Sequence, residues 1–308
     1  MTEIAASGPR LRPRPSVLAG LMQGLFPVLV VLMAIIALWY VATVFLNATW
    51  AQDQAARAGQ PLGFTELLRA TMVQDRPVLP APHQVAAGLW DGIFGQKITS
   101  KRSLVWHGWI TLAPTLLGFA IGSLAGILLA VGIVHSRVMD MSVMPWAIAS
   151  QTVPIVALAP MVIVVLSSMG ITGLLPKALI SAWLTFFPVL VGMVKGLRAP
   201  DRMQLDLMHS WNAGQAQVFW RLRLPSAMPY LFASLKVAVA AALVGTIVGE
   251  LPGGASAGLG ARLLSGSYYG QTIQIWSALF MAATIAAGLV LLIGMIERIT
   301  LRRMGLAR

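Results

Sequence analysis

Long apolar runs dominate the hydrophobic pattern of this 308-residue chain. A membrane-spanning helix needs about 20 mostly apolar residues, and inside a bilayer such a run folds as a helix because no water is present to satisfy its backbone. The pattern therefore predicts an all-α, polytopic membrane protein. Its six expected spans are Val17–Phe45, Trp106–Val134, Met144–Val165, Leu174–Val194, Leu231–Val248 and Ile273–Ile296.

The composition supports this interpretation and excludes several kinds of chemistry. Apolar residues make up 57% of the chain and charged residues 10%, which lies outside the usual range of water-soluble domains. The absence of cysteine excludes disulfides, thiolate catalysis and cysteine-based metal sites. The four histidines stand far apart in no ligand spacing, so we expect no metal site; they are His83, His107, His135 and His209.

The basic residues predict the orientation of the spans. With the N-terminus inside the cell, most arginines fall in cytoplasmic segments and few fall in short external loops, as the positive-inside rule requires. We expect cytoplasmic tails at 1–16 and 297–308, and a retained first helix at 17–45 whose apolar core is too long for a cleavable signal. The net charge of +12 then reflects topology and contact with anionic membrane lipids rather than nucleic acid.

A long external loop is expected at 46–105. Prolines at 77, 80 and 82 interrupt any continuous helix in this segment. A short amphipathic helix is expected near Val85–Ile93. The loop either covers the protein surface or docks an external partner.

The spans carry little ionisable chemistry. They contain no ladder of carboxylates and no acid or histidine pair at helical spacing, which disfavours an ion-driven transporter. No catalytic set can be assembled from them, which disfavours a membrane-embedded enzyme. Glu250, at the end of the fifth span, is either a pathway group or a helix-end residue at the interface. An ion-coupled secondary transporter and a non-transporting scaffold or enzyme remain the alternatives to the hypothesis developed below.

ATP binding through a P-loop is excluded by the sequence. The motif ends in Gly-Lys-Ser/Thr, and each of the five lysines lacks both the preceding glycine and the following hydroxyl residue; these are Lys97, Lys101, Lys177, Lys195 and Lys236. If ATP drives transport, a separate cytoplasmic protein must hydrolyse it. We therefore expect this chain to be no enzyme and to bind no cofactor.

The connection at 195–230 is the longest expected cytoplasmic loop. Asp201 precedes Gln204 by three residues, and Asn212 precedes Gln215 by three, so two capping boxes predict two short helices. The first is expected to end near Asn212-Ala213-Gly214 in a left-handed turn. Pro225 is expected to push Leu224 out of the helical region and to end the second helix there, fixing its angle to the membrane helix that follows.

Within this loop, "LDLMHSWNAGQAQVFWRLRLPSAMPYLFASLKVA" resembles the cytoplasmic signature of bacterial ABC-importer permeases. Asp206 stands at the family's glutamate, Leu207 and Met208 at its two alanines, and Asn212 at its glycine. The remaining signature positions are kept. The resemblance implies that contact with the ATPase is carried by Asp206, Asn212, Ala213, Gly214, Phe219, Leu224, Pro225 and Pro229.

Further segments resemble one subfamily of these permeases, which serves taurine, aliphatic sulfonates, nitrate and pyrimidine precursors of thiamine. They are "LPAPHQVAAGLWDGI", "TVPIVALAPMVIVVLSSMGITG", "FFPVLVGMVKGLRAPD" and "ASAGLGARLL", and the resemblance runs from Val78 to Arg303. It implies a type I importer permease of the bacterial inner membrane, with a five-helix core at 106–296. It also implies a second permease copy, two cytoplasmic ATPase subunits that use ATP and Mg, and an extracytoplasmic solute-binding protein. The short helix around Asp206 to Phe219 would dock into a cleft on the ATPase.

A weakly polar, aromatic pathway is the remaining expectation. Its candidate residues are Gln151, Thr152, Pro154, Trp183, Phe187 and Glu250. Since the spans hold almost no basic residue to balance an anion, the sequence favours a neutral heteroaromatic solute, such as a pyrimidine, over a sulfonate or nitrate.

Overall fold

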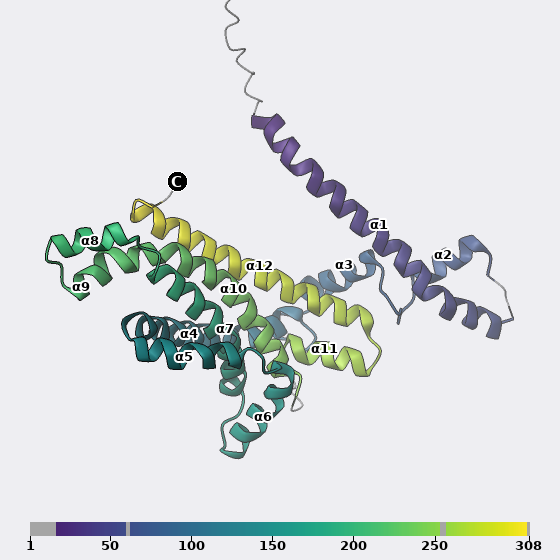
Figure 1. Cartoon of the computed structure of the whole chain (residues 1–308). Coiled ribbons are helices and arrows are strands. Elements are labelled where there is room, and N and C mark those ends of the chain that lie inside the picture. The colour runs from purple at the N-terminus through teal and green to yellow at the C-terminus, as the bar shows by residue number, and fades with distance from the viewer. Residues whose placement is uncertain (1–16, 60–61, 253–256, 307–308) are drawn as a thin grey trace, which may run out of the picture. The chain divides into compact units, whose positions relative to one another are not determined.

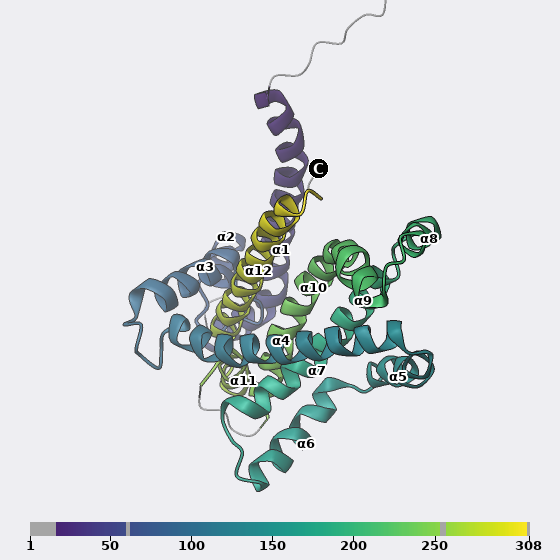
Figure 2. The same cartoon turned by 90° about the vertical axis from the view of Figure 1, so that its left-hand side faces the viewer.

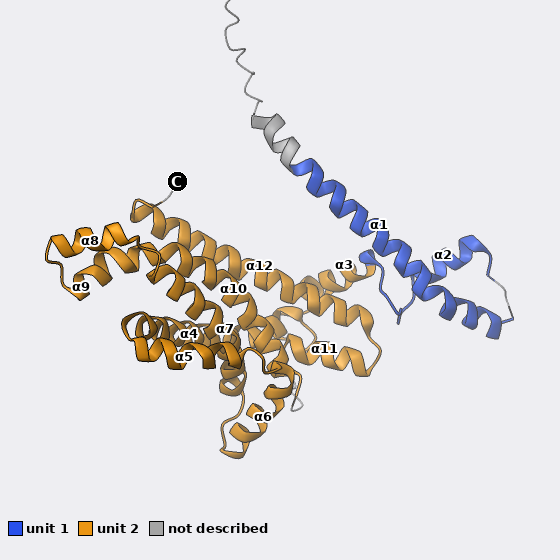
Figure 3. Cartoon of the chain, viewed as in Figure 1, with its two compact units in different colours: residues 1–83 blue, residues 84–308 orange. Residues whose placement is uncertain are grey.

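The computed structural model describes residues 17–59, 62–252 and 257–306, and side chains from residue 25 onward. The described residues form helices joined by short turns and contain no strand, as the sequence predicts. The chain divides into two compact units, residues 1–83 and 84–308 (Figure 3). The tail expected at 1–16 lies outside the described residues.

The first unit is built on a helix that is longer than predicted. Helix α1 runs from Val17 to Arg57 and does not end at Phe45, because the segment that follows is rich in helix-forming residues and has no proline or glycine. Helix α2 follows at Phe64–Met72. Much of the expected loop at 46–105 is thus helical.

Asn47 fixes the segment after α2 to α1. Its buried Oδ1 accepts the backbone N–H groups of Val78 at 2.8 Å and Leu79 at 3.2 Å, and its Nδ2 donates to the Leu79 carbonyl at 2.9 Å. A buried polar side chain with its hydrogen bonds made orders the backbone around it. The expected short helix is confirmed as α3, Pro82–Trp90, which continues as a π-helical turn, η1, at Asp91–Gly95.

Three long helices form the centre of the second unit (Figure 1): α4 at Leu104–His135, α7 at Leu174–Leu197 and α10 at Leu224–Glu250. Glycines at every fourth position of α4 let α7 approach closely. A Cβ at Gly122 would lie 2.6 Å from the Ala182 carbonyl oxygen, and one at Gly126 would lie 2.6 Å from the Phe186 carbonyl oxygen. Small residues at this spacing bring membrane helices into backbone contact.

Helix α12, Thr272–Arg303, packs against α10, and α11, Leu259–Tyr268, packs beneath the start of α12 (Figure 2). The main apolar core lies between α4, α7 and α10 toward the end of α7, around Ile133, Leu190, Met193 and Leu197. This core supports the segment 198–223 that connects α7 to α10.

The third predicted span is wrong as a single helix. It is divided into α5, Arg137–Ser150, and α6, Ile155–Ser168, which meet at 98°. Pro154 explains the break, because a proline lacks the N–H that would continue the helix and pushes the residue before it out of the helical region. In the described part of the chain, five helices are long and apolar enough to cross a membrane, or six if this bent pair forms one span.

Candidate functional site

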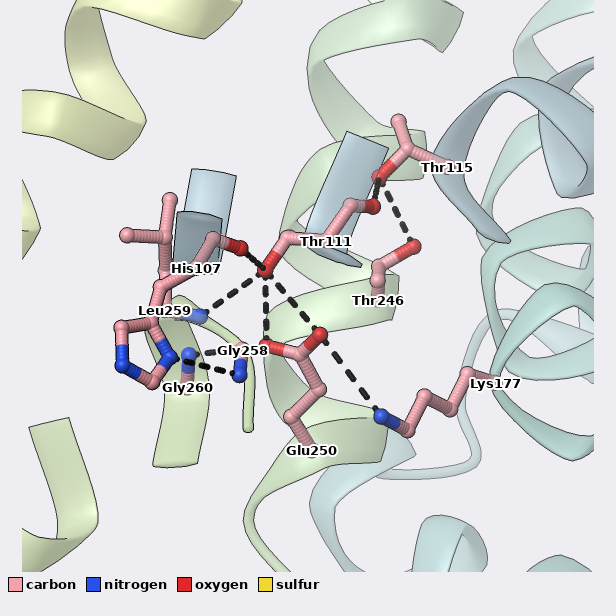
Figure 4. A network of polar contacts seen from close by, with 9 residues as sticks. All are labelled: His107, Thr111, Thr115, Lys177, Thr246, Glu250, Gly258, Leu259 and Gly260. Carbon is pink, nitrogen blue, oxygen red and sulfur yellow. Dashed lines mark hydrogen bonds and ion pairs between the residues drawn. The ribbon is translucent and has the colours of Figure 1, made fainter. Parts of the chain in front are cut away.

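Glu250 lies at the centre of a buried polar cluster where α4, α7, α10 and α11 meet (Figure 4). Its side chain is fully buried. The Thr111 hydroxyl lies 3.0 Å from both carboxylate oxygens and donates to them, and Lys177 Nζ lies 3.8 Å from Oε1. Next to this group, Thr115 donates to the Thr246 hydroxyl at 3.0 Å. A buried carboxylate requires such partners, because removing a charge from water without them is costly.

The same cluster caps the N-terminus of α11. Three successive backbone N–H groups point at side chains from other helices: Gly258 donates to His107 Nδ1 at 3.0 Å, Leu259 to Thr111 Oγ1 at 2.8 Å, and Gly260 to Glu250 Oε2 at 2.8 Å. The first N–H groups of a helix have no partner within it. Gly258, at the N-cap, has no side chain that could supply one, so α4 and α10 provide the acceptors.

The geometry fixes the protonation of His107. Since Nδ1 accepts from Gly258, the hydrogen must lie on Nε2, which is 2.9 Å from the Lys101 carbonyl oxygen. Both ring nitrogens are therefore engaged, and the ring is a neutral connector between the start of α4 and the start of α11.

Glycines allow this close approach. Gly258 has φ +123°, which a residue with a side chain rarely adopts, and a Cβ there would overlap the Glu250 carboxyl group. Of this cluster, the sequence singles out Glu250 and assigns no role to His107 or Thr111. The glycines of "ASAGLGARLL", so soon after an acid, are the signal that points to a close approach here.

The segment that connects α7 to α10 begins with helix α8, Arg202–Ser210. The capping box predicted at Asp201 is present, since its carboxylate accepts from the Arg202 N–H at 2.6 Å and Gln204 Oε1 accepts from the Asp201 N–H at 3.1 Å. The helix ends, as predicted, at a left-handed residue: Asn212 has φ +53°. Its N–H donates to the His209 carbonyl, and the Ala213 N–H donates to the Met208 carbonyl, the two bonds of a Schellman motif.

The second capping box, predicted at Asn212, is wrong because that residue is already used to end α8. Helix α9, Gln215–Val218, starts instead from Gly214, whose N–H donates to Gln217 Oε1 at 3.2 Å. Glycine tolerates the N-cap position, and the glutamine three residues on completes the turn.

Pro225 does not end the second helix, which corrects the sequence prediction. Leu224 is helical, with φ −64° and ψ −48°, and α9 continues into α10 through a π-helical turn, η2, at Phe219–Arg223. In this turn the Leu224 N–H donates to the Phe219 carbonyl, five residues back. The wider turn relieves the clash that a proline ring makes with the carbonyl four residues before it, so the helix passes Pro225 and later Pro229 without a break.

The two faces of this segment differ. Phe219 packs inward against the main core and meets the His135 ring edge-on, with 5.4 Å between centroids. Along α8 and at its C-cap, three large apolar side chains at a spacing of four point outward: Met203 is 77% exposed, Leu207 51% and the C-cap residue Trp211 71%. Residues four apart share one face of a helix. Asp206 is also exposed on α8.

The predicted pathway residues fall in separate places. Gln151, Thr152 and Pro154 are exposed in the bend between α5 and α6, while Trp183 and Phe187 are half-buried on α7, each packed against the Phe186 ring. Glu250 belongs to the cluster described above.

An ion pair between membrane helices lies outside the predicted sites. Lys236 in α10 pairs with Glu297 in α12. Spacing within one helix gives no sign of a partner on another helix. Within the described residues no group of three or more histidines and acids could hold a metal ion.

Comparison with known proteins gives consistent matches. The family model described as "binding-protein-dependent transport system inner membrane component" matches residues 122–305. The chain is 30% identical over 226 residues to the riboflavin transport system permease protein of Chloroflexus aurantiacus, covering 73% of this chain and 80% of that one. It is 32% identical over 193 residues to the formylaminopyrimidine transport permease protein of Halalkalibacterium halodurans, covering 63% and 72%. It is 24% identical to a nitrate import permease protein of Synechococcus elongatus, covering 62% and 67%.

Proposed function

Because this chain belongs to the family of binding-protein-dependent inner-membrane transport components, we propose that α8 receives the work of a partner ATPase and that the solute imported is a neutral nitrogen heteroaromatic. The chain itself is a multi-pass inner-membrane permease of an ABC importer. ATP and Mg would be used by the partner. Two ATPase subunits, a second permease copy and a solute-binding protein complete the proposed assembly.

The outward face of α8 supports the coupling role. An exposed apolar stripe is formed by Met203 and Leu207 on α8 and by Trp211 at its C-cap, and α8 itself has no buried residue. Exposed apolar side chains gathered on one face are typical of an interaction site. Asp206 beside the stripe adds a charge that can orient the partner. The stripe is the single observation that carries this proposal.

Phe219 has a different proposed role. Its ring contacts His135 and the main core, so it would hold η2 and α9 against α4 rather than enter the ATPase. In this arrangement, force applied to α8 passes through the Asn212 turn and η2 directly into α10. Pro225 and Pro229 lie in the first turns of that helix.

The proposed orientation places α8 and both chain ends in the cytoplasm. Support comes from the arginines: Arg198, Arg221 and Arg223 flank α8 in the sequence, Arg202 begins it, and Arg302 and Arg303 end α12. The Glu250 cluster would then lie at the opposite, external end of the spans.

The proposed solute class rests on how the charges in the spans are balanced. Lys236 pairs with Glu297, Lys177 pairs with Glu250, and both nitrogens of His107 are engaged. These groups leave no excess positive charge for an anion. The half-buried rings of Trp183 and Phe187 offer surfaces for stacking. The relatives named for riboflavin and formylaminopyrimidine transport are in keeping with a heteroaromatic solute.

The coupling role is tested with Trp211→Ala. Loss of an aromatic side chain at the centre of an interface costs about 2 kcal/mol or more of binding free energy. The purified permease should therefore retain much less of the ATPase subunit, and cells should take up less solute. Trp109→Ala is the matched control, because Trp109 is 67% exposed but lies on α4. Full uptake and full ATPase retention in Trp211→Ala, at normal membrane abundance, would contradict the proposal.

The solute class is tested by uptake in cells that lack the chain and in cells in which it is restored. We expect restoration to support uptake of labelled riboflavin or formylaminopyrimidine. Restored uptake of nitrate, with no effect on either heteroaromatic compound, would overturn the solute class and leave the permease role intact.

A further inference from the structure

A polar cavity of about 540 Å³ lies between η1, the start of α4, α11 and the start of α12. Two arginines line it, Arg102 in the turn before α4 and Arg262 on α11, together with the amides of Gln271 and Gln274 and the hydroxyl of Ser277. The one acid in the lining is Asp91, so the cavity carries an excess of positive charge. Its lining includes no residue of the Glu250 cluster and none of α8.

Arg262 has a hydrogen-bonding group that this chain leaves without a partner. Its Nε is buried and has no hydrogen-bond acceptor within the described residues. Neither Arg262 nor Arg102 takes part in an ion pair there, and Asp91 instead receives a hydrogen bond from Gln96 at 3.4 Å. Burial lowers the pKa of the Arg262 guanidinium from its usual value, although the group stays charged at neutral pH. A buried donor on a half-buried charged group calls for an anionic acceptor from outside the chain.

The cavity opens at the level where membrane helices end. Leu104, the first residue of α4, and Ile273, near the start of α12, both line it. Large aromatic side chains are exposed at the same end of the unit: Trp90, Phe94, Trp109, Tyr268 and Tyr269, all 67–79% exposed. Tryptophan and tyrosine collect at the boundary between lipid and water. A lipid headgroup is therefore the anion with direct access to this cavity.

We propose that the cavity binds the headgroup of an anionic phospholipid, with its phosphate on Arg262 and Arg102. Guanidinium groups bind phosphate oxygens through paired, charge-assisted hydrogen bonds. The amides of Gln271 and Gln274 and the Ser277 hydroxyl suit the hydroxyl groups of a headgroup such as glycerol. The bound lipid would link α11 to α12 and to the start of α4, beside the helices that the Glu250 cluster holds together.

The test uses the full chain purified in detergent and titrated with phosphatidylglycerol, with thermal unfolding followed by tryptophan fluorescence and retained lipid counted by native mass spectrometry. For the wild type we expect a rise in unfolding temperature and one retained phosphatidylglycerol that phosphatidylcholine does not replace. Arg262→Gln and the more exposed Arg102→Gln should each raise the half-saturating lipid concentration about tenfold, through loss of a charge-assisted bond. Lys97→Gln, an exposed basic residue outside the cavity, is the matched control and should respond as the wild type does.

Two further comparisons test whether the bound anion is a lipid headgroup or free phosphate, and whether binding requires the arginines of the cavity. Inorganic phosphate at the same concentration should give no comparable rise; an equal rise would overturn the lipid as ligand. An equal phosphatidylglycerol response in Arg102→Gln, Lys97→Gln and the wild type would overturn the site itself. If Arg262→Gln fails to fold, Arg102→Gln carries the test alone.

Discussion

The backbone N–H of Gly260 donates to the Glu250 carboxylate at 2.8 Å, so the acid that ends α10 caps the helix that follows it. Gly258, two residues before Gly260, donates its own backbone N–H to His107 on α4. One carboxylate therefore holds together the end of α10, the start of α11 and, through Thr111, α4. These hydrogen bonds join α4, α10 and α11 at one end of the spans.

Removing the carboxylate should destabilise the protein strongly. In Glu250→Ala the Gly260 N–H and the Lys177 ammonium lose their partner, and breaking a buried charged pair costs about 3–5 kcal/mol. Glu250→Gln keeps an acceptor for Gly260 and should cost less. Unfolding in detergent, followed by heat or by titration with a denaturing detergent, measures both.

Asp53→Asn is the matched control, because it removes one negative charge from an exposed side chain. It should leave the free energy of unfolding unchanged within about 0.5 kcal/mol. If Glu250→Ala proved as stable as this control, the cluster would have no structural role.

Gly258→Ala should be more harmful than an ordinary glycine substitution. The new Cβ would overlap the Glu250 carboxyl, and φ +123° adds backbone strain of about 1–3 kcal/mol. Gly170→Ala separates the two effects, since Gly170 has φ +79° but nothing within 4 Å of a Cβ. The comparison is made by thermal unfolding. An equal fall in unfolding temperature in the two variants would mean that the overlap with Glu250 is relieved without loss of stability.

The helices were predictable from the sequence because membrane helices follow the length of apolar runs. The prediction of helix ends was wrong at two prolines. Pro154 divides α5 from α6, whereas Pro225, expected to end a helix, is accommodated in η2. A proline disfavours the helical conformation of the residue before it, which here is Leu224. This is a local preference, and the packing of Phe219 and Val218 against the core outweighs it.

The sites were less predictable than the helices. Asp201 and Asn212 were found because caps depend on residues close in sequence. Thr111 lies 139 residues before Glu250, and His107 lies 151 residues before Gly258. Spacing along one chain cannot reveal such pairs. The same reason hid Lys236 and Glu297.

Asn212 offers a test of the turn that ends α8. Its φ of +53° costs a residue with a Cβ about 1–2 kcal/mol, a penalty that asparagine reduces and glycine avoids. Asn212→Gly should therefore keep or raise the protection of the Asn212 and Ala213 amides in hydrogen exchange, while Asn212→Val should lower it. Ser210→Ala, in the last turn of α8, is the control. Equal protection in the glycine and valine variants would show that this turn does not govern the local structure.

Pro225→Ala should separate stability from coupling. The alanine N–H can bond to the Arg221 carbonyl four residues back, which removes the reason for the wide turn at η2 and favours a regular α-helix through residues 219–223. Loss of the extra residue in that turn would rotate α9 and α8 by about 100° around the axis of α10, since one residue of an α-helix corresponds to that angle. The free energy of unfolding should stay level or rise, yet solute uptake should fall because the apolar stripe on α8 no longer faces its partner.

The chain has no cysteine, so spin labels on cysteines introduced at Ser210 and Ser136 report the distance between α8 and the end of α4 without background. Pro229→Ala, one turn further into α10, is the matched control and should leave that distance unchanged. An unaltered distance with normal uptake in Pro225→Ala would show that η2 is held by packing alone and that the proline has no part in setting the angle of the coupling surface.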